Sequence, residues 1–361
     1  MDLEAKQPVR DVVQGVVRVA VIGAGAFGRN HLRVYRELQI SEGVVLVAVV
    51  DQSAEVRAAA SEAYNIPAFA SIDELLEAGP AVDAASVCVP TIHHATAAMP
   101  LLAAGMDLLI EKPFAATLAE ADALIRLAEK YGRLIQVGHL ERFNPAVAAA
   151  RAHLNQPMFF EAHRLSIFTA RSLDVDVVLD LLIHDLDIVL SLVDSAVEEV
   201  RAVGLPVLSR TVDIANVRVA FANGCIANFT ASRISTERVR KLRFFQPHQY
   251  LSLDFARQDL LLIDVTAAAG LTDPQLAALV EKHSKPEPEG EPQHPTPGLS
   301  MSKIPVAPGE PLRLELESFL NAVRTRSTPV VDAKAGRRAL ALALEINAAI
   351  KAHAKRAGLA S

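Results

Sequence analysis

A glycine-rich turn between a short apolar run and a predicted helix restricts the fold of this chain more than any other feature. The run Val17–Ile22 is followed at once by Gly23-Ala-Gly-Ala-Phe-Gly28, and a helix is predicted from there to about Leu38. In a G-x-G-x-x-G turn the first glycine permits the bend, the second lets a pyrophosphate approach, and the third lets helix pack on strand. The turn therefore predicts a dinucleotide site, with Gly23, Gly25, Ala26, Phe27 and Gly28 beside the phosphates at a helix N-terminus.

A carboxylate after the next strand indicates which dinucleotide binds. Val44–Val50 is predicted as the second strand, and Asp51 follows it directly. The Asp51 carboxylate can accept hydrogen bonds from the adenosine ribose hydroxyls and would repel a 2′-phosphate, so NAD is favoured over NADP. Arg57 lies further along and does not resemble a dedicated phosphate clamp, although its side chain could reach.

The first 140 residues alternate between predicted strands and helices. Further strands are expected at Ala84–Val89, Asp107–Ile110 and Arg133–Gly138, and helices are expected around 54–60, at His94–Ala104 and at Thr117–Lys130. Thr117 and Glu120 have the spacing of a capping box. Apolar strands that alternate with helices predict a parallel sheet covered on both faces.

The pattern changes after about Phe143. Successive strands are predicted at Met158–Phe168, Val197–Gly204, Ile214–Phe221, Cys225–Ser232, Val239–Phe245, Tyr250–Asp254 and Leu260–Asp264. Asn223-Gly224 between two of them is a hairpin signal. Helices are expected near Val178–Leu192, at Leu312–Arg324 and at Ala333–Ala354. The expected fold class is α/β: an N-terminal Rossmann domain plus a C-terminal α+β domain with a large, open, mostly antiparallel sheet.

Three segments follow from this division. Residues 1–143 form the dinucleotide domain, with a flexible start at 1–15, and residues 144–332 form the substrate and oligomerisation domain. Residues 333–361 are expected to return as a helix to the first domain. Residues 282–311 contain eight prolines, which predicts an irregular or disordered loop; a flap over the active site or an arm to another subunit is the alternative.

Composition excludes several classes of protein. The net charge of −6 gives no indication of nucleic-acid or anionic-membrane binding. Cys88 and Cys225 are the two cysteines of the sequence, and they suggest neither a disulfide framework nor a zinc site. The N-terminus lacks a signal-peptide core, and no apolar stretch reaches the roughly 18 residues that a membrane helix needs. A reduced, cytoplasmic protein is expected.

Lys112 is the first candidate for chemistry. It follows the strand Asp107–Ile110 and precedes Pro113, and the carboxyl ends of strands in open α/β sheets face the ligand crevice. In isolation, a surface lysine in a loop is the simpler interpretation. Pro90, Thr91 and His94 follow another strand end, where they can border the nicotinamide.

A second candidate lies on the helix predicted near 178–192. Asp180 and His184 are four residues apart and so share one helix face, and Asp187 could approach His184 from the other side. A carboxylate beside an imidazole fixes its tautomer and favours its protonated form, which suits a general base. A helix pair exposed to water is the alternative interpretation.

Together these motifs resemble the Gfo/Idh/MocA family of NAD(P)-dependent sugar oxidoreductases. The segment 23–28 matches the dinucleotide turn, Glu111-Lys112-Pro113 matches the family's E-K-P signature, and Asp180 with His184 matches its D-x-x-x-H motif. The resemblance covers nearly the whole chain. It implies oxidation of a secondary hydroxyl on a sugar ring with NAD and without a metal.

The resemblance also implies roles for these residues. His184 would take the hydroxyl proton, and Lys112 would hydrogen-bond the reacting oxygen and stabilise its developing negative charge. Asp180 would orient His184 or bind a neighbouring hydroxyl, and Glu111 would support the cofactor loop rather than react. Family members associate through the open face of the second sheet, so a homodimer or homotetramer is expected.

The substrate is indicated by two segments, 138–145 and 231–243. They are similar to the branch of the family that oxidises the 3-hydroxyl of UDP-N-acetylglucosamine, whose product goes to an aminotransferase for lipid A synthesis. The candidate substrate contacts are Arg142, Asn144, Arg164, Arg233 and Arg238, since arginines suit a diphosphate. Around Arg238 and Arg240, however, charged and apolar residues partly alternate, as on a strand with one solvated face.

Other functions stay open at this point. The same chemistry could act on another sugar, an inositol or a UDP-hexuronate. A protein of another class, a non-catalytic NAD-sensing regulator, would not need Lys112, Asp180 and His184 together.

Overall fold

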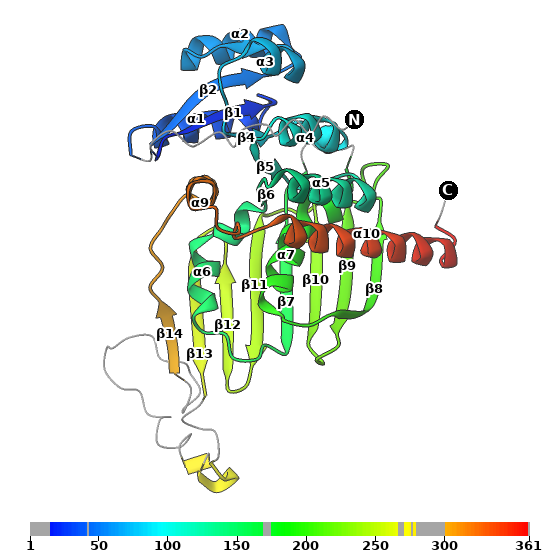
Figure 1. Cartoon of the computed structure of the whole chain (residues 1–361). Coiled ribbons are helices and arrows are strands. Elements are labelled where there is room, and N and C mark those ends of the chain that lie inside the picture. The colour runs from blue at the N-terminus through cyan, green and yellow to red at the C-terminus, as the bar shows by residue number, and fades with distance from the viewer. Residues whose placement is uncertain are drawn as a thin grey trace. The chain divides into compact units, whose positions relative to one another are not determined.

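The computed structural model describes residues 15–41, 43–168, 175–265, 271–275, 277–278 and 300–359. The chain forms two compact units, each built on its own sheet (Figure 1). Unit 1 comprises Met1–Leu140 and Glu310–Leu340, and unit 2 comprises Glu141–Gly309 and Ala341–Ser361. The predicted division differs at two places: it assigns residues 310–332 to the second domain, whereas the structure places them in unit 1. It also assigns all of residues 333–361 to the first domain, whereas the structure places residues 341–361 in unit 2. The expected flexible start lies, except for Gly15, outside the described residues.

The sheet of unit 1 has the order β3-β2-β1-β4-β5-β6, and every pair in it is parallel. Its strands are β1 (Val17–Ile22), β2 (Val44–Val50), β3 (Ala68–Phe69), β4 (Ala84–Val87), β5 (Asp107–Glu111) and β6 (Ile135–Gly138). The connecting helices are α1 (Gly28–Leu38), α2 (Ala54–Tyr64), α3 (Ile72–Ala78), the 3₁₀ turn η2 (Thr91–His93), α4 (His94–Ala103) and α5 (Leu118–Tyr131). The strand order reverses between β1 and β4, and ligands of such sheets bind at that switch point.

Apolar packing fixes the dinucleotide turn at the end of β1. Helix α1 and helix α9 (Pro311–Thr325) share one core with β1 and β2, in which Leu32, Tyr35 and Phe319 are fully buried. The predicted capping box of α5 is confirmed, because Thr117 Oγ1 accepts from the amide of Glu120 at 3.2 Å and the Glu120 carboxylate accepts from the amide of Thr117 at 3.0 Å.

Unit 2 contains an eight-stranded sheet in the order β14-β13-β12-β11-β7-β10-β9-β8. Its strands are β7 (Phe159–Leu165), β8 (Val197–Leu205), β9 (Ile214–Phe221), β10 (Ile226–Ser232), β11 (Val239–Gln246), β12 (Gln249–Asp254), β13 (Asp259–Asp264) and β14 (Ser300–Ile304). The pair β7–β10 is parallel and the other pairs are antiparallel. The prediction of a mostly antiparallel sheet is therefore confirmed, as is the hairpin at Asn223-Gly224.

Part of the segment predicted as a proline-rich loop forms a strand. Residues 300–304 contain no proline and pair with β13 as strand β14, and α9 begins at Pro311. Residues 282–299 lie outside the described part of the chain.

One face of the unit 2 sheet is covered by helices. These are α6 (Pro145–Arg151), α7 (Ile183–Leu192) and the part of α10 (Ala333–Arg356) that belongs to this unit (Figure 1). Along β9, Val217 and Val219 point to the covered face and are buried, whereas Asn216 and Arg218 are exposed. None of the helices in the described residues is both long and apolar enough to span a bilayer.

Candidate active site

The three glycines of the dinucleotide turn have different surroundings. Gly23 has a φ of +90°, and a Cβ there would lie 2.9 Å from the Val89 nitrogen. A Cβ on Gly28 would lie 1.8 Å from the Gly23 carbonyl oxygen, whereas a Cβ on Gly25 would meet no atom within 4 Å. The backbone therefore requires Gly23 and Gly28 for its own packing, and Gly25 leaves open space where a pyrophosphate can approach.

The turn borders a cleft of about 430 Å³ at the carboxyl ends of β1, β2 and β4. Asp51 lines this cleft, and its carboxylate accepts the amides of Ala24 at 2.8 Å and Ser53 at 2.9 Å. These two bonds orient the carboxylate and leave lone pairs that can accept from ribose hydroxyls. Arg57 Nη1 donates to the carbonyls of Asp51 and Gln52, both at 2.8 Å, so its guanidinium lies beside this rim.

Pro90 lines the cleft, as expected, but His94 is turned away into the protein. Its ring nitrogens each lie 2.9 Å from a carbonyl oxygen, Nδ1 from Pro113 and Nε2 from Val89. Burial lowers the pKa of His94. His94 thus joins the loops that follow β4 and β5, which is a supporting role rather than the predicted direct cofactor contact. Thr91 lies in η2 and is half-buried.

The E-K-P segment combines a buried carboxylate with a half-buried lysine. Glu111 Oε1 lies 2.9 Å from His31 Nε2. A Cβ on Gly138 would come within 2.8 Å of the Glu111 carboxylate, so this position of β6 requires a glycine. Lys112 follows directly and is partly accessible. These contacts agree with the expectation that Glu111 supports the loop that carries Lys112.

Among the described residues, His31, Cys88 and Glu111 form a group of potential metal ligands. Their ligand atoms lie within 4.8 Å of one another. The hydrogen bond between His31 and Glu111 already uses one nitrogen and one carboxylate oxygen, and burial raises the pKa of Cys88 well above its ordinary value. The group is therefore a buried hydrogen-bonded pair beside a protonated thiol.

In unit 2 the predicted helix begins with a π-helical turn, η4 (Val178–Leu182), and continues as α7. Asp180 lies in the π turn and His184 in the first turn of α7, and both are half-buried. The predicted shared face of Asp180 and His184 requires a regular α-helix, which the structure does not have at Asp180. The expected approach of Asp187 to His184 is replaced by an ion pair, since Asp187 accepts from Arg142 at 2.8 and 2.6 Å.

Two more of the predicted substrate arginines, Arg164 and Arg233, are also held in buried ion pairs. Arg164 donates to Asp185 through Nε and Nη2, at 2.8 and 2.9 Å, and to Glu141 through Nη1 at 3.0 Å. Arg233 Nε donates to Asp213 at 2.8 Å. Because these guanidinium groups are buried and engaged, we no longer assign Arg142, Arg164 and Arg233 to a diphosphate.

The remaining predicted substrate contacts, Asn144 and Arg238, differ from each other in burial. Asn144 is buried, caps the start of α6 by accepting the amide of Ala146 at 3.1 Å, and donates to the Phe255 carbonyl at 3.0 Å. It is part of the scaffold rather than a substrate contact. Arg238 is exposed just before β11 and stays a candidate.

Sequence reasoning missed part of the cleft wall. Ala70, Ser71 and Ile72, between β3 and α3, line the cleft together with His93 and Thr96. The signal was present, because Ser71 precedes Glu74 by three residues and accepts its amide at 3.1 Å as a helix cap. The elements around it, of two and seven residues, are too short for a periodic pattern.

A parallel sheet with this turn at its switch point, followed by a mostly antiparallel sheet, defines a two-part protein with a Rossmann dinucleotide-binding fold. The oxidoreductase family with an NAD-binding Rossmann fold matches residues 17–139, and the GFO/IDH/MocA C-terminal domain matches residues 146–246. The chain belongs to the Gfo/Idh/MocA family of oxidoreductases.

Relatives narrow the comparison further. The chain is 35% identical to UDP-N-acetylglucosamine 3-dehydrogenase of Acidithiobacillus ferrooxidans over 341 residues, covering 94% of this chain and 99% of that one. A solved structure of that enzyme has a TM-score of 0.80, 34% identity, and coverage of 93% and 98% of the two chains. An inositol 2-dehydrogenase of Leifsonia xyli subsp. xyli is 36% identical over 136 residues, which cover 37% of this chain and 39% of that enzyme.

Proposed function

We propose that this protein is an NAD-dependent dehydrogenase that oxidises the 3-hydroxyl of UDP-N-acetylglucosamine to a ketone. The proposal is carried by the 35% identity to an enzyme of that name, which extends over both units of the chain. The inositol 2-dehydrogenase match covers little more than a third of either chain. Membership of an oxidoreductase family favours an enzyme over an NAD-sensing regulator.

The dinucleotide cleft fits the proposed cofactor. The open space at Gly25 can admit a pyrophosphate, and the carboxylate of Asp51 can accept from the adenosine ribose. A 2′-phosphate would meet that negative charge, so NAD is proposed over NADP; the nearby Arg57 guanidinium is the group that could offset the repulsion. NAD, when bound, supplies the acceptor for the hydride.

The side chains of the E-K-P and D-x-x-x-H motifs would handle the proton. In the proposal His184 accepts the proton of the 3-hydroxyl group, and Asp180 orients or stabilises the imidazole. The Lys112 ammonium group hydrogen-bonds the same oxygen and stabilises the negative charge that develops on it. Glu111, engaged with His31, holds the loop and takes no proton.

Substrate recognition is proposed for exposed basic residues of unit 2. Arg238 precedes β11, on which Arg240, Lys241 and Arg243 are also exposed. Arg240 lies 3.6 Å from Glu141 and Arg243 lies 3.9 Å from Glu161; both distances are long, and each arginine side chain is about half exposed. We therefore propose Arg238 as the first residue to test for diphosphate binding.

A coupled assay tests the function. The purified protein is given NAD and UDP-N-acetylglucosamine, together with an aminotransferase and its amino-acid donor, which convert the 3-keto product to an amine. NADH is followed by its absorbance. We expect NADH formation with this sugar nucleotide, much less NADPH when NADP replaces NAD, and much less NADH with free N-acetylglucosamine, myo-inositol or a UDP-hexuronate. No NADH with the trap present would reject the substrate assignment.

Matched variants test the residues. We expect Lys112→Met and His184→Gln to lower kcat at least 100-fold while the Kd for NAD stays within about twofold. Wild-type turnover in Lys112→Met would remove the lysine from the mechanism.

Three further proposals accompany the function. The protein is expected to act in the cytoplasm, to pass its product to an aminotransferase in lipid A synthesis, and to form a homodimer or homotetramer. The uncovered face of the unit 2 sheet supports the last of these, since a large exposed sheet face favours association.

A further inference from the structure

Three consecutive residues ahead of the π turn, Val175, Asp176 and Val177, are held by three different parts of unit 2. The Val175 carbonyl accepts from Arg233 Nη1 at 2.7 Å, and the Val177 amide donates to the Val212 carbonyl at 2.9 Å. Between them, Asp176 Oδ1 accepts the amides of Val178 and Leu179 at 2.9 and 3.0 Å. Asp176 Oδ2 accepts from Asn347 of α10 at 2.9 Å.

Arg233 is the hub of this arrangement. Besides Val175, it donates through Nε to Asp213 at 2.8 Å and through Nη2 to Ser209 at 2.9 Å and Thr211 at 2.5 Å. Arg233 follows the last residue of β10, and its backbone amide also donates to the Asp213 carbonyl at 3.0 Å. The side chain is 6% exposed, so these contacts are largely shielded from solvent.

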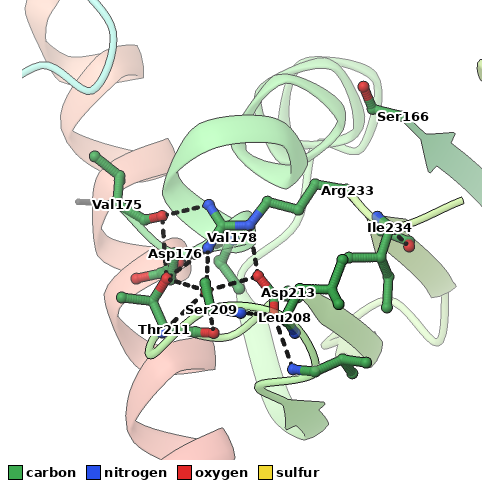
Figure 2. A network of polar contacts seen from close by, with 12 residues as sticks. Ser166, Val175, Asp176, Val178, Leu208, Ser209, Thr211, Asp213, Arg233 and Ile234 are labelled. Atoms are coloured by element: carbon green, nitrogen blue, oxygen red, sulfur yellow. Dashed lines mark hydrogen bonds and ion pairs between the residues drawn. The ribbon is translucent and has the colours of Figure 1, made fainter. Parts of the chain in front are cut away.

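Asp213 fixes the other end of the arginine. Its carboxylate accepts the amides of Val207, Leu208 and Ser209 at 2.8, 2.7 and 2.8 Å, in addition to the Ser209 hydroxyl at 2.7 Å. The loop 206–213 is thereby wound around one carboxylate, and the same loop supplies the Val212 carbonyl that holds Val177. Figure 2 shows Arg233 between this loop and Val175.

We infer that Arg233, locked by Asp213, is a positioning residue that sets where the helix carrying Asp180 and His184 begins and which face it presents. The Asp180 amide donates to the Asp176 carbonyl at 3.0 Å, so the start held by Arg233 continues directly into the π turn. A shift of one residue in that start would rotate each following side chain by about 100°. Single π turns occur mostly at functional sites. The inference rests on the proposed roles of Asp180 and His184.

Kinetics of matched variants test the inference. Arg233→Met removes the guanidinium group and its charge, whereas Arg233→Lys keeps the positive charge without the guanidinium group. The control, Arg201→Met, removes an arginine whose side chain is 74% exposed on β8 of the same sheet. We expect Arg233→Met to lower kcat at least 30-fold with the Kd for NAD unchanged, and guanidinium ions at millimolar concentration to restore part of the loss. Arg233→Lys should fall in between and gain less from guanidinium, and Arg201→Met should match the wild type.

A second measurement does not depend on activity. Hydrogen exchange of the Val177 and Asp180 amides, which donate to Val212 and Asp176, should become at least tenfold faster in Arg233→Met and remain unchanged in Arg201→Met. Unchanged exchange with wild-type kcat would overturn the inference. If the wild type oxidises none of the tested sugars, the proposed function fails, whereas faster exchange at these two amides would still support the structural role of Arg233.

Asn347→Ala provides a test in case Arg233→Met does not fold. This substitution on α10 removes the hydrogen bond that Asn347 donates to Asp176, and it leaves Arg233 and Asp213 unchanged. We expect a smaller loss of kcat, about threefold to tenfold, with faster exchange of the Val178 and Leu179 amides. Wild-type kcat and exchange in this variant would show that the helix start does not need its side-chain anchors, and would also overturn the inference.

Discussion

At the scale of single residues, Gly25 and Gly28 of the dinucleotide turn differ in the space available for a side chain. A Cβ on Gly28 would collide with the Gly23 carbonyl at 1.8 Å, whereas a Cβ on Gly25 would meet nothing within 4 Å. We expect Gly28→Ala to lower the Tm by at least 5 °C, since the backbone must move. Gly25→Val should leave the Tm unchanged and weaken NAD binding at least tenfold, because its side chain enters the pyrophosphate space. Thermal unfolding and calorimetric titration with NAD measure both. A Gly28→Ala protein with wild-type Tm would contradict the packing argument.

Asp213 gives a prediction about acid stability. Burial alone would raise the pKa of Asp213, but the hydrogen bonds from Ser209, Val207 and Arg233 outweigh burial and hold the pKa well below its ordinary value. A carboxyl whose folded pKa is depressed stabilises the fold above its unfolded pKa of about 3.9, and this stabilisation is lost as pH falls through the folded pKa.

We therefore expect Asp213→Asn to lower the free energy of unfolding by about 2 kcal/mol at pH 7. The difference from the wild type should shrink as the pH falls below about 4. Urea unfolding at pH 7, 5 and 3.5 measures it. A difference that stays constant over this range would show that the charge of Asp213 is not what stabilises the loop.

At the scale of secondary-structure elements, periodic and long segments were predictable from the sequence. Strands such as Val17–Ile22 and Val44–Val50, and the capped helix α5, appear at their predicted positions, because each carries its own pattern and its own stop signal. The two-residue β3, the seven-residue α3 and strand β14 were missed, since segments of this length carry too little pattern. The parallel pairing of β7 with β10 is also a property of the sheet rather than of either strand.

The candidate site was predictable to a different extent. The dinucleotide turn is local, and its glycines could be interpreted from spacing alone. The state of an arginine depends on a partner elsewhere in the chain: Arg164 pairs with Asp185, 21 residues away, and Arg142 pairs with Asp187, 45 residues away. The sequence therefore identified the basic residues, but it could not show that their guanidinium groups are buried in ion pairs with other side chains.

These buried pairs predict how α7 is anchored. Arg164→Met would leave Asp185 and Glu141 buried without their main cation, so we expect a loss of about 3 to 5 kcal/mol in the free energy of unfolding. Arg240→Met removes an arginine that is half exposed and 3.6 Å from the same Glu141, and should cost less than about 1 kcal/mol. Chemical denaturation of both variants makes the comparison. Equal losses would mean that the interior pair is no more important than the surface one.

At the scale of the whole molecule, the two units divide the proposed work. The residues proposed for NAD lie in unit 1, and Asp180, His184 and their anchor Arg233 lie in unit 2. Substitutions in the anchor should therefore separate turnover from cofactor binding. The sheet of unit 2 has, in addition, one face that no helix of this unit in the described residues covers, and the proposed association would use that face.

An aromatic group marks the uncovered face. Phe245 on β11 lies directly across from Phe159 on β7 and Tyr250 on β12, with ring centroids 5.4 and 4.9 Å apart. The Phe245 side chain is 38% exposed in the single chain. Phe245 is the second-last residue of β11, beside the β11–β12 hairpin, and exposed aromatic residues are typical anchors of protein interfaces. If a second copy covers this part of the face, a charge at position 245 would have to be buried on association and would oppose it.

We therefore expect Phe245→Glu to shift the protein to a species of one-chain mass in size-exclusion chromatography with light scattering, while its fold is retained in circular dichroism. Ile40→Glu places the same charge on the most exposed apolar side chain of unit 1, at 92% exposure, and should leave the oligomer intact. The comparison separates a local effect from a change in net charge, which is the same in both variants. An oligomer that persists in Phe245→Glu but dissociates in Ile40→Glu would place the interface on unit 1, and the sheet face would then need another explanation for its exposed aromatic rings.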